Sequence, residues 1–161
     1  LGELRDEATI EAAVELSLTG HPVFATTHAS NIGSIFPRLI SRFPKDVQGQ
    51  KGYDLVDVTR FLVAQKLVWT VDKKRIAIRE ELEITEGLRA ELIKYSQQPD
   101  VLYRIINMIM KQETFSAVSY ASQANQMLED GVIDKTNYFY LVGNYNELTL
   151  DEIATIKGYT T

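Results

Sequence analysis

The chain has 161 residues, its 17 Lys and Arg against 22 Asp and Glu give a net charge of −5, and 45% of it is apolar. These values are typical of a globular domain and predict a core that holds the fold without metals or disulfides. The absence of cysteine excludes disulfides, thiolate zinc sites and cysteine nucleophiles. The acidic balance argues against nonspecific binding of nucleic acid or anionic membranes, but leaves room for a local basic groove.

Apolar stretches are short throughout the sequence. The longest, such as residues 105–110, fall far below the ~20 residues that cross a bilayer, and the N-terminus lacks a charged and then apolar signal pattern. We therefore expect a soluble intracellular chain with no transmembrane segment. Because the chain starts at Leu1 rather than at Met, we also expect it to be a piece of a longer protein.

The N-terminal residues predict a helix that leads directly into a strand. Asp6 is a candidate N-cap, apolar residues follow at helical spacing, and Gly20 marks the end of the helix. Residues 22–27 are apolar and β-branched and are too short for a helix, so they predict a buried strand. A helix followed by a strand is typical of an α/β layer.

The next segment predicts broken helical structure and then a loop. Apolar residues in 32–43 fall at spacings of three and four, with Ser30 or Asn31 as the N-cap and a kink or new helical piece at Pro37. Residues 43–52 are polar and contain glycine, which predicts a loop.

Residues 54–66 predict a further helix, and the two β-rich runs 67–71 and 75–84 predict a hairpin, although the turn between them lacks glycine. From Thr85 onward the pattern is helical to the end of the chain. The change near Thr85 is the best candidate for a domain boundary. The sequence thus indicates an α/β part over 1–85 and a helical region over 86–161.

Helix start and stop signals recur in this C-terminal region. Pro99 suits a first helical position, a helix follows Ser116 and stops at Gly131, and Asp134 can cap another. A capping box at residues 149–152 predicts a last short helix.

Glu3 is the first candidate for chemistry. The segment that carries it would end a strand if apolar residues preceded it, and open α/β sheets place ligand-handling groups at such ends. Glu3 is then suited to orient a water or to hold Mg²⁺ through water. The alternative is that Glu3, Arg5 and Asp6 are solvated charges that lead into a capped helix.

The chain has 2 histidines, His21 and His28, one at each end of the predicted strand. Seven residues of strand, at ~3.3 Å each, separate them too far to share a metal. Each is suited to bind a phosphate or to sense protons, with the Thr26 and Thr27 hydroxyls beside His28. The alternative is a structural hydrogen-bonding role.

Other catalytic devices are missing from the sequence. It contains no Gly-x-x-x-x-Gly-Lys-Ser/Thr phosphate loop, no Gly-x-Ser-x-Gly elbow, no His-Glu-x-x-His and no dinucleotide fingerprint. A charged patch is either a subunit contact or solvated surface; it comprises Arg79, Glu80, Glu81 and Arg89. The apolar cluster at 105–110 is either core or a partner groove.

Several segments together resemble one family, the type II/type IV secretion ATPases, which are the hexameric motors of secretion, conjugation and pilus dynamics. The first hundred residues carry the resemblance best. Its segments are Gly2–Asp6, Thr19–His28, Arg42–Pro44, Ala64–Leu67, Arg75–Glu80 and Gly87–Arg89. The last segments resemble pilus-retraction motors, and Arg75–Glu80 with the polar insertion before Asp54 leans toward conjugation and type IVB secretion motors.

The resemblance implies a fold and a nucleotide. Residues 1–85 would be the C-terminal part of a RecA-like ATPase core, a mixed sheet with a hairpin, and residues 86–161 a C-terminal helical bundle. Glu3 is similar to the Walker B glutamate, which supports Mg²⁺ through water and the attacking water, while Arg5 and Asp6 would shape the same strand end. The expected cofactors are ATP and Mg²⁺ in the full-length protein.

Two further motifs acquire roles from the resemblance. His21 and His28 match the two histidines of the His box, with Thr19, Gly20 and Thr27 around them near the γ-phosphate and the subunit interface. Arg89 matches the arginine of a helical motif associated with retraction motors, where it implies a mechanical or interface role.

The resemblance also implies a setting for the full-length protein. It would form a hexameric ring that works with secretion or pilus machinery and binds no nucleic acid directly. The ring would lie in the cytoplasm, held at the inner membrane by partner proteins.

The sequence departs from the family pattern because the phosphate loop and Asp box that precede Walker B are absent, and Ala29 stands where Thr is common. We therefore expect no ATPase activity from this chain alone. The alternative is a noncatalytic module that binds partners or assembles a secretion machine.

Overall fold

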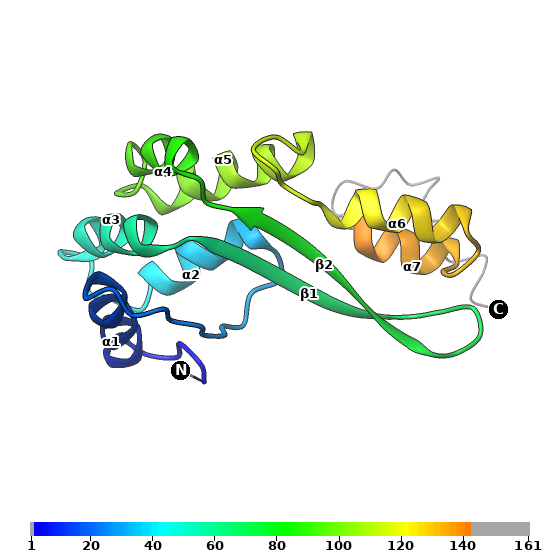
Figure 1. The fold of residues 1–161 in the computed structure, drawn as a ribbon, viewed down its shortest axis with the longest axis horizontal. Helices are drawn as coiled ribbons and strands as arrows, with labels where there is room; N and C mark the ends of the chain where they lie inside the picture. Colours follow the sequence, from blue (N-terminus) through cyan, green and yellow to red (C-terminus); the bar gives the residue numbers. More distant parts are fainter. Residues whose placement is uncertain (1, 143–161) are drawn as a thin grey trace. The chain divides into compact units, whose positions relative to one another are not determined.

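A computed structural model describes residues 2–142 of the chain. It combines helices with a two-stranded antiparallel sheet (Figure 1). In chain order the elements are α1 (Glu7–Leu18), the 3₁₀ helix η1 (Ile32–Ser34), α2 (Ile35–Ile40), α3 (Gln48–Val58), β1 (Phe61–Trp69), β2 (Arg75–Glu83), α4 (Glu86–Ile93), α5 (Pro99–Gln112), α6 (Tyr120–Glu129) and α7 (Lys135–Val142). The predicted capping box at 149–152 lies outside the described residues.

The described residues form two compact units. The first unit comprises residues 2–64 and 81–117, and the second comprises Gln65–Glu80 with residues 118–142. This grouping follows the packing of the chain, while the predicted boundary near Thr85 stays a prediction. In the part of the chain that the structure covers, no helix is both long and apolar enough to span a bilayer.

Both predicted ends of α1 are confirmed. The Asp6 carboxylate accepts a hydrogen bond of 2.9 Å from the backbone N–H of Thr9, and the bonds from Thr9 lower the pKa of Asp6. At the other end Gly20 has φ +88°, a left-handed conformation that suits glycine. The N–H groups of Gly20 and His21 reach back to the carbonyls of Ser17 and Leu16, the pattern of a Schellman motif.

The buried strand predicted at 22–27 is wrong for this structure. The segment is extended but forms a single parallel bridge, between Thr26 and Glu3, and Phe24 is 86% exposed. A strand is stabilised by hydrogen bonds to neighbours along its length, and in the described residues only the short segment around Glu3 provides them. The apolar composition of the segment therefore does not bury it here.

Residues 32–40 are helical, which confirms the prediction except for its last three residues, and Asn31 rather than Ser30 caps η1. Pro37 lies in the first turn of α2, where its missing N–H costs no hydrogen bond. The predicted loop at 43–52 is correct only as far as Val47, because α3 begins at Gln48 despite two glycines in its first turns.

Gly52 shows why glycine lies inside α3. A Cβ on this residue would overlap the backbone oxygen of Ser96 and lie 3.2 Å from Ile40 Cδ1. The glycine therefore serves close packing of helix backbone against the segment after α4, rather than a turn. Sequence reasoning treats glycine as a breaker, and only the tertiary contact identifies this use.

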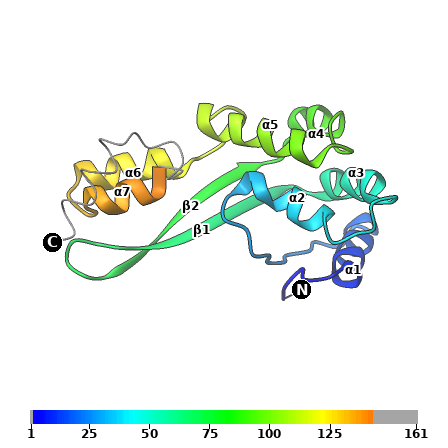
Figure 2. The same cartoon turned by 180° about the vertical axis from the view of Figure 1, so that it is seen from behind.

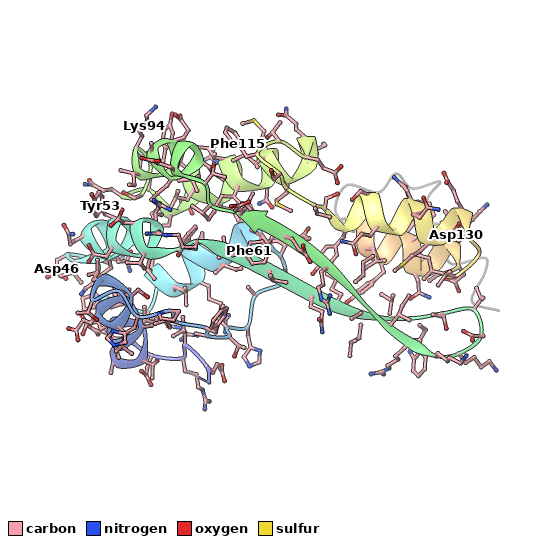
Figure 3. The ribbon with its side chains drawn as sticks, in the orientation of Figure 1. Asp46, Tyr53, Phe61, Lys94, Phe115 and Asp130 are labelled. Atoms are coloured by element: carbon pink, nitrogen blue, oxygen red, sulfur yellow. The ribbon has the colours of Figure 1, made fainter. Side chains whose placement is uncertain are left out.

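The predicted hairpin is confirmed, but its first strand is longer than expected. α3 ends at Val58 and β1 begins at Phe61, so the helix predicted over 54–66 is wrong from Thr59 onward (Figure 3). Side chains of β1 alternate between exposed and buried, the period of two that a strand imposes. The turn without glycine places Lys73 at φ 61°, the left-handed conformation that a glycine would adopt more easily.

The first unit buries apolar side chains from α1 to α5. Thr85 caps α4 through its side chain. Pro99 occupies the first position of α5, as predicted. The cluster at 105–110 is mostly core: Ile106, Ile109 and Met110 are buried, whereas Met108 points to solvent. α5 packs on α2 and η1, and the shared core lies between them (Figure 2).

The second unit consists of the outer part of the hairpin with α6 and α7, which lie side by side (Figures 1 and 2). α6 begins at Tyr120 with Ser119 as its cap, three residues after the predicted Ser116. Gly131 follows α6 at φ +66°, and Asp134 accepts the backbone N–H of Asn137 at 2.8 Å, so both predicted signals are confirmed.

A lysine in an aromatic cage joins the hairpin to these helices. Lys66 Nζ lies 4.5 Å from the ring centre of Tyr120 and 5.2 Å from that of Tyr140. Burial lowers the pKa of Lys66, while Glu80 opposes that shift, and burial raises the pKa of Tyr120. The cation is thus stabilised by two ring faces in a partly dry site.

The Tyr120 hydroxyl is buried and has no hydrogen-bond partner within the part of the chain that the structure covers. We expect Tyr120→Phe to leave the free energy of unfolding unchanged or to raise it by up to about 1 kcal/mol, because it removes an unsatisfied polar group and keeps the ring over Lys66. Urea unfolding checks this, with Tyr120→Leu as the destabilised control that loses the ring. A clear loss of stability in Tyr120→Phe would contradict it.

Candidate functional site

The chain segment that carries Glu3 pairs with the segment between the two histidines. Leu4 N donates to Thr26 O at 2.8 Å, and Thr26 N donates to Gly2 O at 3.2 Å. The Thr26 hydroxyl donates a further bond of 2.6 Å to Gly2 O. These bonds form the parallel bridge between Glu3 and Thr26, and they hold two segments together that are distant in sequence.

This bridge brings Glu3 to one of the predicted histidines. His28 Nε2 lies 3.3 Å from Glu3 Oε1, and the other carboxylate oxygen lies 3.8 Å from Arg5 Nε. The Glu3 side chain is 32% exposed and that of His28 is 81% exposed. The carboxylate is thus partly sheltered and oriented by two nitrogen groups, and it stays open on one side to a ligand or water.

The other residues predicted for this site lie around α1. His21 Nδ1 is 3.1 Å from Thr19 Oγ1, and both flank Gly20 just after the helix ends. Asp6 directs its carboxylate to the backbone of its own helix, where it accepts from Thr9. Thr27 is half-buried between Thr26 and His28. The structure therefore joins Glu3 to His28 and Arg5, and gives His21 a local partner.

Arg89 lies in the first unit at the start of α4. Its Nη2 donates to the carbonyl of Ile84 at 3.3 Å, whereas its Nε is buried without a partner in the described region. The charged patch predicted with it is not uniform, because Glu80 is buried and Arg79 is exposed. Arg89 is therefore a partly buried cation whose remaining hydrogen-bonding capacity is unused here.

The chain by itself offers few of the groups that ATP and Mg²⁺ require. Over residues 2–142, no cluster of three or more His, Asp or Glu side chains is arranged to hold a metal ion. Glu3 is suited to a contact with Mg²⁺ through water, because its carboxylate is exposed in part and bound only to nitrogen donors. The Gly-x-x-x-x-Gly-Lys-Ser/Thr motif, which binds nucleotide phosphates directly, does not occur in these 161 residues.

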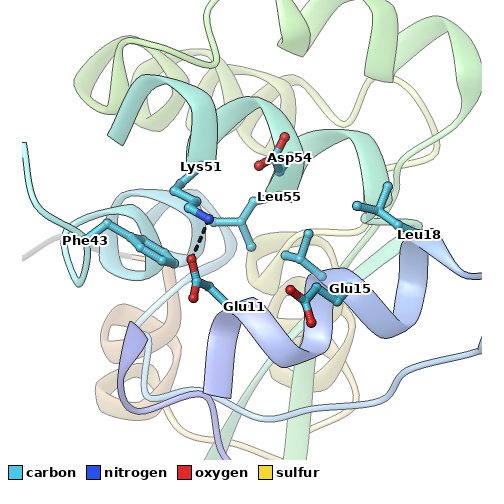
Figure 4. Close-up of a pocket in the computed structure, with 8 residues that line it drawn as sticks. Glu11, Glu15, Leu18, Phe43, Lys51, Asp54 and Leu55 are labelled. Atoms are coloured by element: carbon cyan, nitrogen blue, oxygen red, sulfur yellow. Dashed lines mark hydrogen bonds and ion pairs between the residues drawn. The ribbon is translucent and has the colours of Figure 1, made fainter. Parts of the chain in front are cut away.

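A separate cavity of about 220 Å³ lies between α1 and α3 (Figure 4). Lys51 Nζ bonds to Glu11 Oε1 at 2.6 Å and lies 5.4 Å from the ring centre of Phe43. The hydrogen bond to Glu11 raises the pKa of Lys51. Sequence reasoning missed this pair, since Glu11 and Lys51 are far apart in the chain and carry no motif. The pairing links α3 to α1.

Comparisons with known proteins bear on this arrangement. Residues 1–131 match the family model described as "Type II/IV secretion system protein". The chain is 31% identical over 151 residues to the "Type IV pilus ATPase PilU" of Pseudomonas aeruginosa, which covers 93% of this chain and 38% of that protein. It is also 28% identical over 89 residues to the "Type IV pilus retractation ATPase PilT" of the same species, covering 55% of this chain and 26% of that protein.

Solved structures agree with the sequence relatives. The ATPase DotB of Yersinia pseudotuberculosis superposes with a TM-score of 0.79 at 39% identity, over 87% of this chain and 35% of that one. DotB of Legionella pneumophila gives a TM-score of 0.78 at 32% identity, over 88% of this chain and 37% of that one.

The pilus retraction motor PilT bound to ADP, at 22% identity and a TM-score of 0.72, shares the fold over 91% of this chain and 40% of that one. The chain thus spans less than half the length of the proteins it matches, and its fold is that of part of a RecA-like secretion ATPase. With the family model matched over residues 1–131, the chain belongs to the type II/IV secretion system protein family.

Proposed function

We propose that this chain is the C-terminal segment of an ATP-hydrolysing motor that powers type IV secretion, conjugation or pilus dynamics. The observation that carries the proposal is the contact of 3.3 Å between Glu3 and His28, held by the backbone bridge to Thr26. A carboxylate fixed beside an imidazole at the end of a backbone pairing is suited to orient a water for attack on a phosphate. The relatives named PilU, PilT and DotB are ATPases by their names and support this reading.

The remaining roles follow from the same proposal. Mg²⁺ bound with ATP would neutralise phosphate charge, and Glu3 would contact that ion through water. His28 and His21, with Thr19, Gly20 and Thr27, would face the γ-phosphate side and a neighbouring subunit, while Arg5 and Asp6 shape the strand end. Arg89 would contribute to transmission of movement, for which its buried Nε, without a partner among residues 2–142, offers a donor.

The proposed setting is a hexameric ring in the cytoplasm that docks on secretion or pilus machinery at the inner membrane. The two named pilus ATPases among the relatives support partners of this class. A noncatalytic assembly module is the second candidate. The lack of a phosphate loop in these 161 residues favours it, because most of the donors that bind a triphosphate are then missing.

Phosphate release separates the two candidates. We expect the purified 161-residue chain to release no phosphate from ATP above the buffer control. A longer form that includes a phosphate loop is expected to hydrolyse ATP. Turnover by the short chain would contradict the first expectation, and an inactive longer form that still binds its assembly partners would favour the noncatalytic module. The coding sequence upstream of Leu1 is the first place to look for such a loop.

A further inference from the structure

The outer part of the hairpin exposes one face that carries both apolar and cationic side chains. In the second unit, Leu67, Trp69 and Val71 are 56%, 51% and 58% exposed, whereas Val68 and Ile78, on the opposite face, are 2% and 0% exposed. We call the exposed set the tip face. It consists of Leu67, Trp69, Val71, Arg75, Ala77 and Arg79.

The opposite face is already occupied within the same unit. Lys66, which alternates with the tip face along β1, lies over the rings of Tyr120 in α6 and Tyr140 in α7. Because successive side chains of a strand point to opposite sides, the tip face points away from α6 and α7. Its exposed apolar area is therefore not part of the core of this unit.

The register of the hairpin arranges the side chains of the tip face in two columns, one on each strand. Thr70 N donates to Lys74 O at 2.8 Å, which pairs these residues and sets Trp69 opposite Arg75. The same count sets Leu67 opposite Ala77. The β1 column is therefore apolar, and the β2 column carries two guanidinium groups on either side of an alanine.

Both guanidinium groups are positioned by neutral neighbours. Arg75 Cζ lies 4.6 Å from the ring centre of Trp69, and Arg79 Nε donates to Gln65 Oε1 at 3.2 Å. Neither forms a salt bridge with any residue that the structure describes. An arginine held over an aromatic ring keeps its donors free for a carboxylate and loses little entropy on binding one.

The local charge is opposite to that of the chain. Residues 65–80 contain five Lys and Arg against two Asp and Glu, a net charge of +3, whereas the whole chain has −5. Of these charges, Lys66 and Glu80 lie on the other face, and Asp72 is paired with Lys74 at 2.9 Å. The charged residues of the tip face itself are Arg75 and Arg79. The tip face is thus a locally basic surface on a chain whose overall charge is negative.

Strand addition is disfavoured at Arg79, because its backbone is already bonded. The Gln123 amide donates to Arg79 O at 2.6 Å, and Arg79 N donates to Gln123 Oε1 at 3.5 Å. Nearer the turn, Val71 N donates to Val132 O at 3.0 Å. A ligand therefore meets the tip face through side chains rather than by extending β2 there.

We propose that the tip face docks an acidic amphipathic α-helix of a partner protein. Arg75 and Arg79 are four residues apart on one strand, about 13 Å, which matches carboxylates seven or eight residues apart on a helix, about 11–12 Å. An apolar stripe beside those carboxylates would cover Leu67, Trp69 and Val71. Trp and Arg are also the residues that most often dominate binding energy at protein interfaces.

A membrane surface fits the tip face less well. An anionic bilayer would attract its arginines, but it would repel the remainder of an acidic chain. The ordered arrangement of one apolar and one cationic column also suits a rigid partner better than a fluid layer. The proposal goes beyond the nucleotide chemistry proposed above and uses none of its residues, so either can fail without the other.

The test uses the whole chain and a fluorescein-labelled helical peptide of about 18 residues, with leucines on one face and glutamates seven residues apart beside them. A matched peptide carries lysine in place of each glutamate. We expect the acidic peptide to bind at micromolar concentrations by fluorescence anisotropy, and the lysine peptide to bind at least tenfold more weakly. Trp69, which is the single tryptophan of the chain, provides a second signal through a blue shift of its emission.

Variants locate the binding. Arg75→Glu and Trp69→Ala should each lower the affinity for the acidic peptide at least tenfold. The affinity of Arg75→Lys should lie between those of these variants and that of the parent. Arg42→Glu makes the same change of charge at an exposed position in the first unit and should bind as the parent does. Circular dichroism checks that every variant is folded.

The opposite results would overturn the proposal. They are equal affinity for the two peptides, no binding of the acidic peptide, or loss of binding in Arg42→Glu equal to that in Arg75→Glu. Cosedimentation with vesicles of phosphatidylcholine and phosphatidylglycerol, without binding of the acidic peptide, would identify a lipid surface instead. None of these measurements requires nucleotide, so their outcome is independent of ATP hydrolysis.

Discussion

Glu3→Gln, made in a form of the protein that includes a phosphate loop, is expected to lower kcat for ATP hydrolysis by about 100-fold or more. Glutamine has the same shape, and its amide oxygen can still meet His28 Nε2 across the present 3.3 Å. It lacks the negative charge that attracts a water proton and that supports Mg²⁺ through water. The substitution therefore removes the charge that hydrolysis needs but keeps the shape of the side chain. ATP binding should persist for that reason.

The measurement is steady-state phosphate release, together with titration of a fluorescent ATP analogue. Glu7→Gln is the matched control, because Glu7 is an exposed carboxylate in the first turn of α1 and lies outside the contact between Glu3 and His28. It should keep activity within about twofold of the parent. Comparable activity in Glu3→Gln and in the parent would contradict the role proposed for Glu3.

Gly52→Ala is expected to lower the free energy of unfolding by about 3 kcal/mol. The new methyl group would overlap the backbone oxygen of Ser96, and a backbone atom cannot rotate away as a side-chain end can. The helix α3 would have to move from the segment that follows α4, which would disturb the packing of α3 on α4 in the first unit. Urea unfolding followed by circular dichroism measures the loss.

Gly49→Ala is the matched control in the same helix. A Cβ at Gly49 would lie 3.5 Å from Gln97 Cγ, which is ordinary contact. Alanine also has the higher helix propensity, so we expect this variant to be as stable as the parent or more stable by about 0.5 kcal/mol. If both variants lost the same stability, helix propensity rather than the contact with Ser96 would explain the effect.

Local signals account for the elements that sequence reasoning predicted correctly. Asp6 and Asp134 cap helices because a short polar side chain satisfies a free N–H at the helix start, whatever surrounds it. Pro99 and Gly20 likewise act through their own backbone restrictions. These effects depend on the nearest few residues, so the sequence alone is sufficient for them.

The errors occur where distant contacts override local preference. Leu62 continues the helical spacing of Leu55 and Val58, but residues 61–66 form part of β1 because β2 pairs with them. Gln48–Gly52 look like a loop and are helical because Gly52 packs against the Ser96 backbone. Residues 22–27 look like a buried strand and stay exposed, since their backbone has too few partners among the described residues.

The candidate site divides in the same way. Residue type and spacing were enough to single out Glu3, His21 and His28, because carboxylate and imidazole groups near predicted strand ends carry recognisable chemistry. That His28 rather than His21 meets Glu3 was decided by the bridge to Thr26, and the face of the hairpin that stays open was decided by α6 and α7 on its other side. Spacing along the chain reports only local geometry, whereas these contacts join segments that come together only when the chain folds.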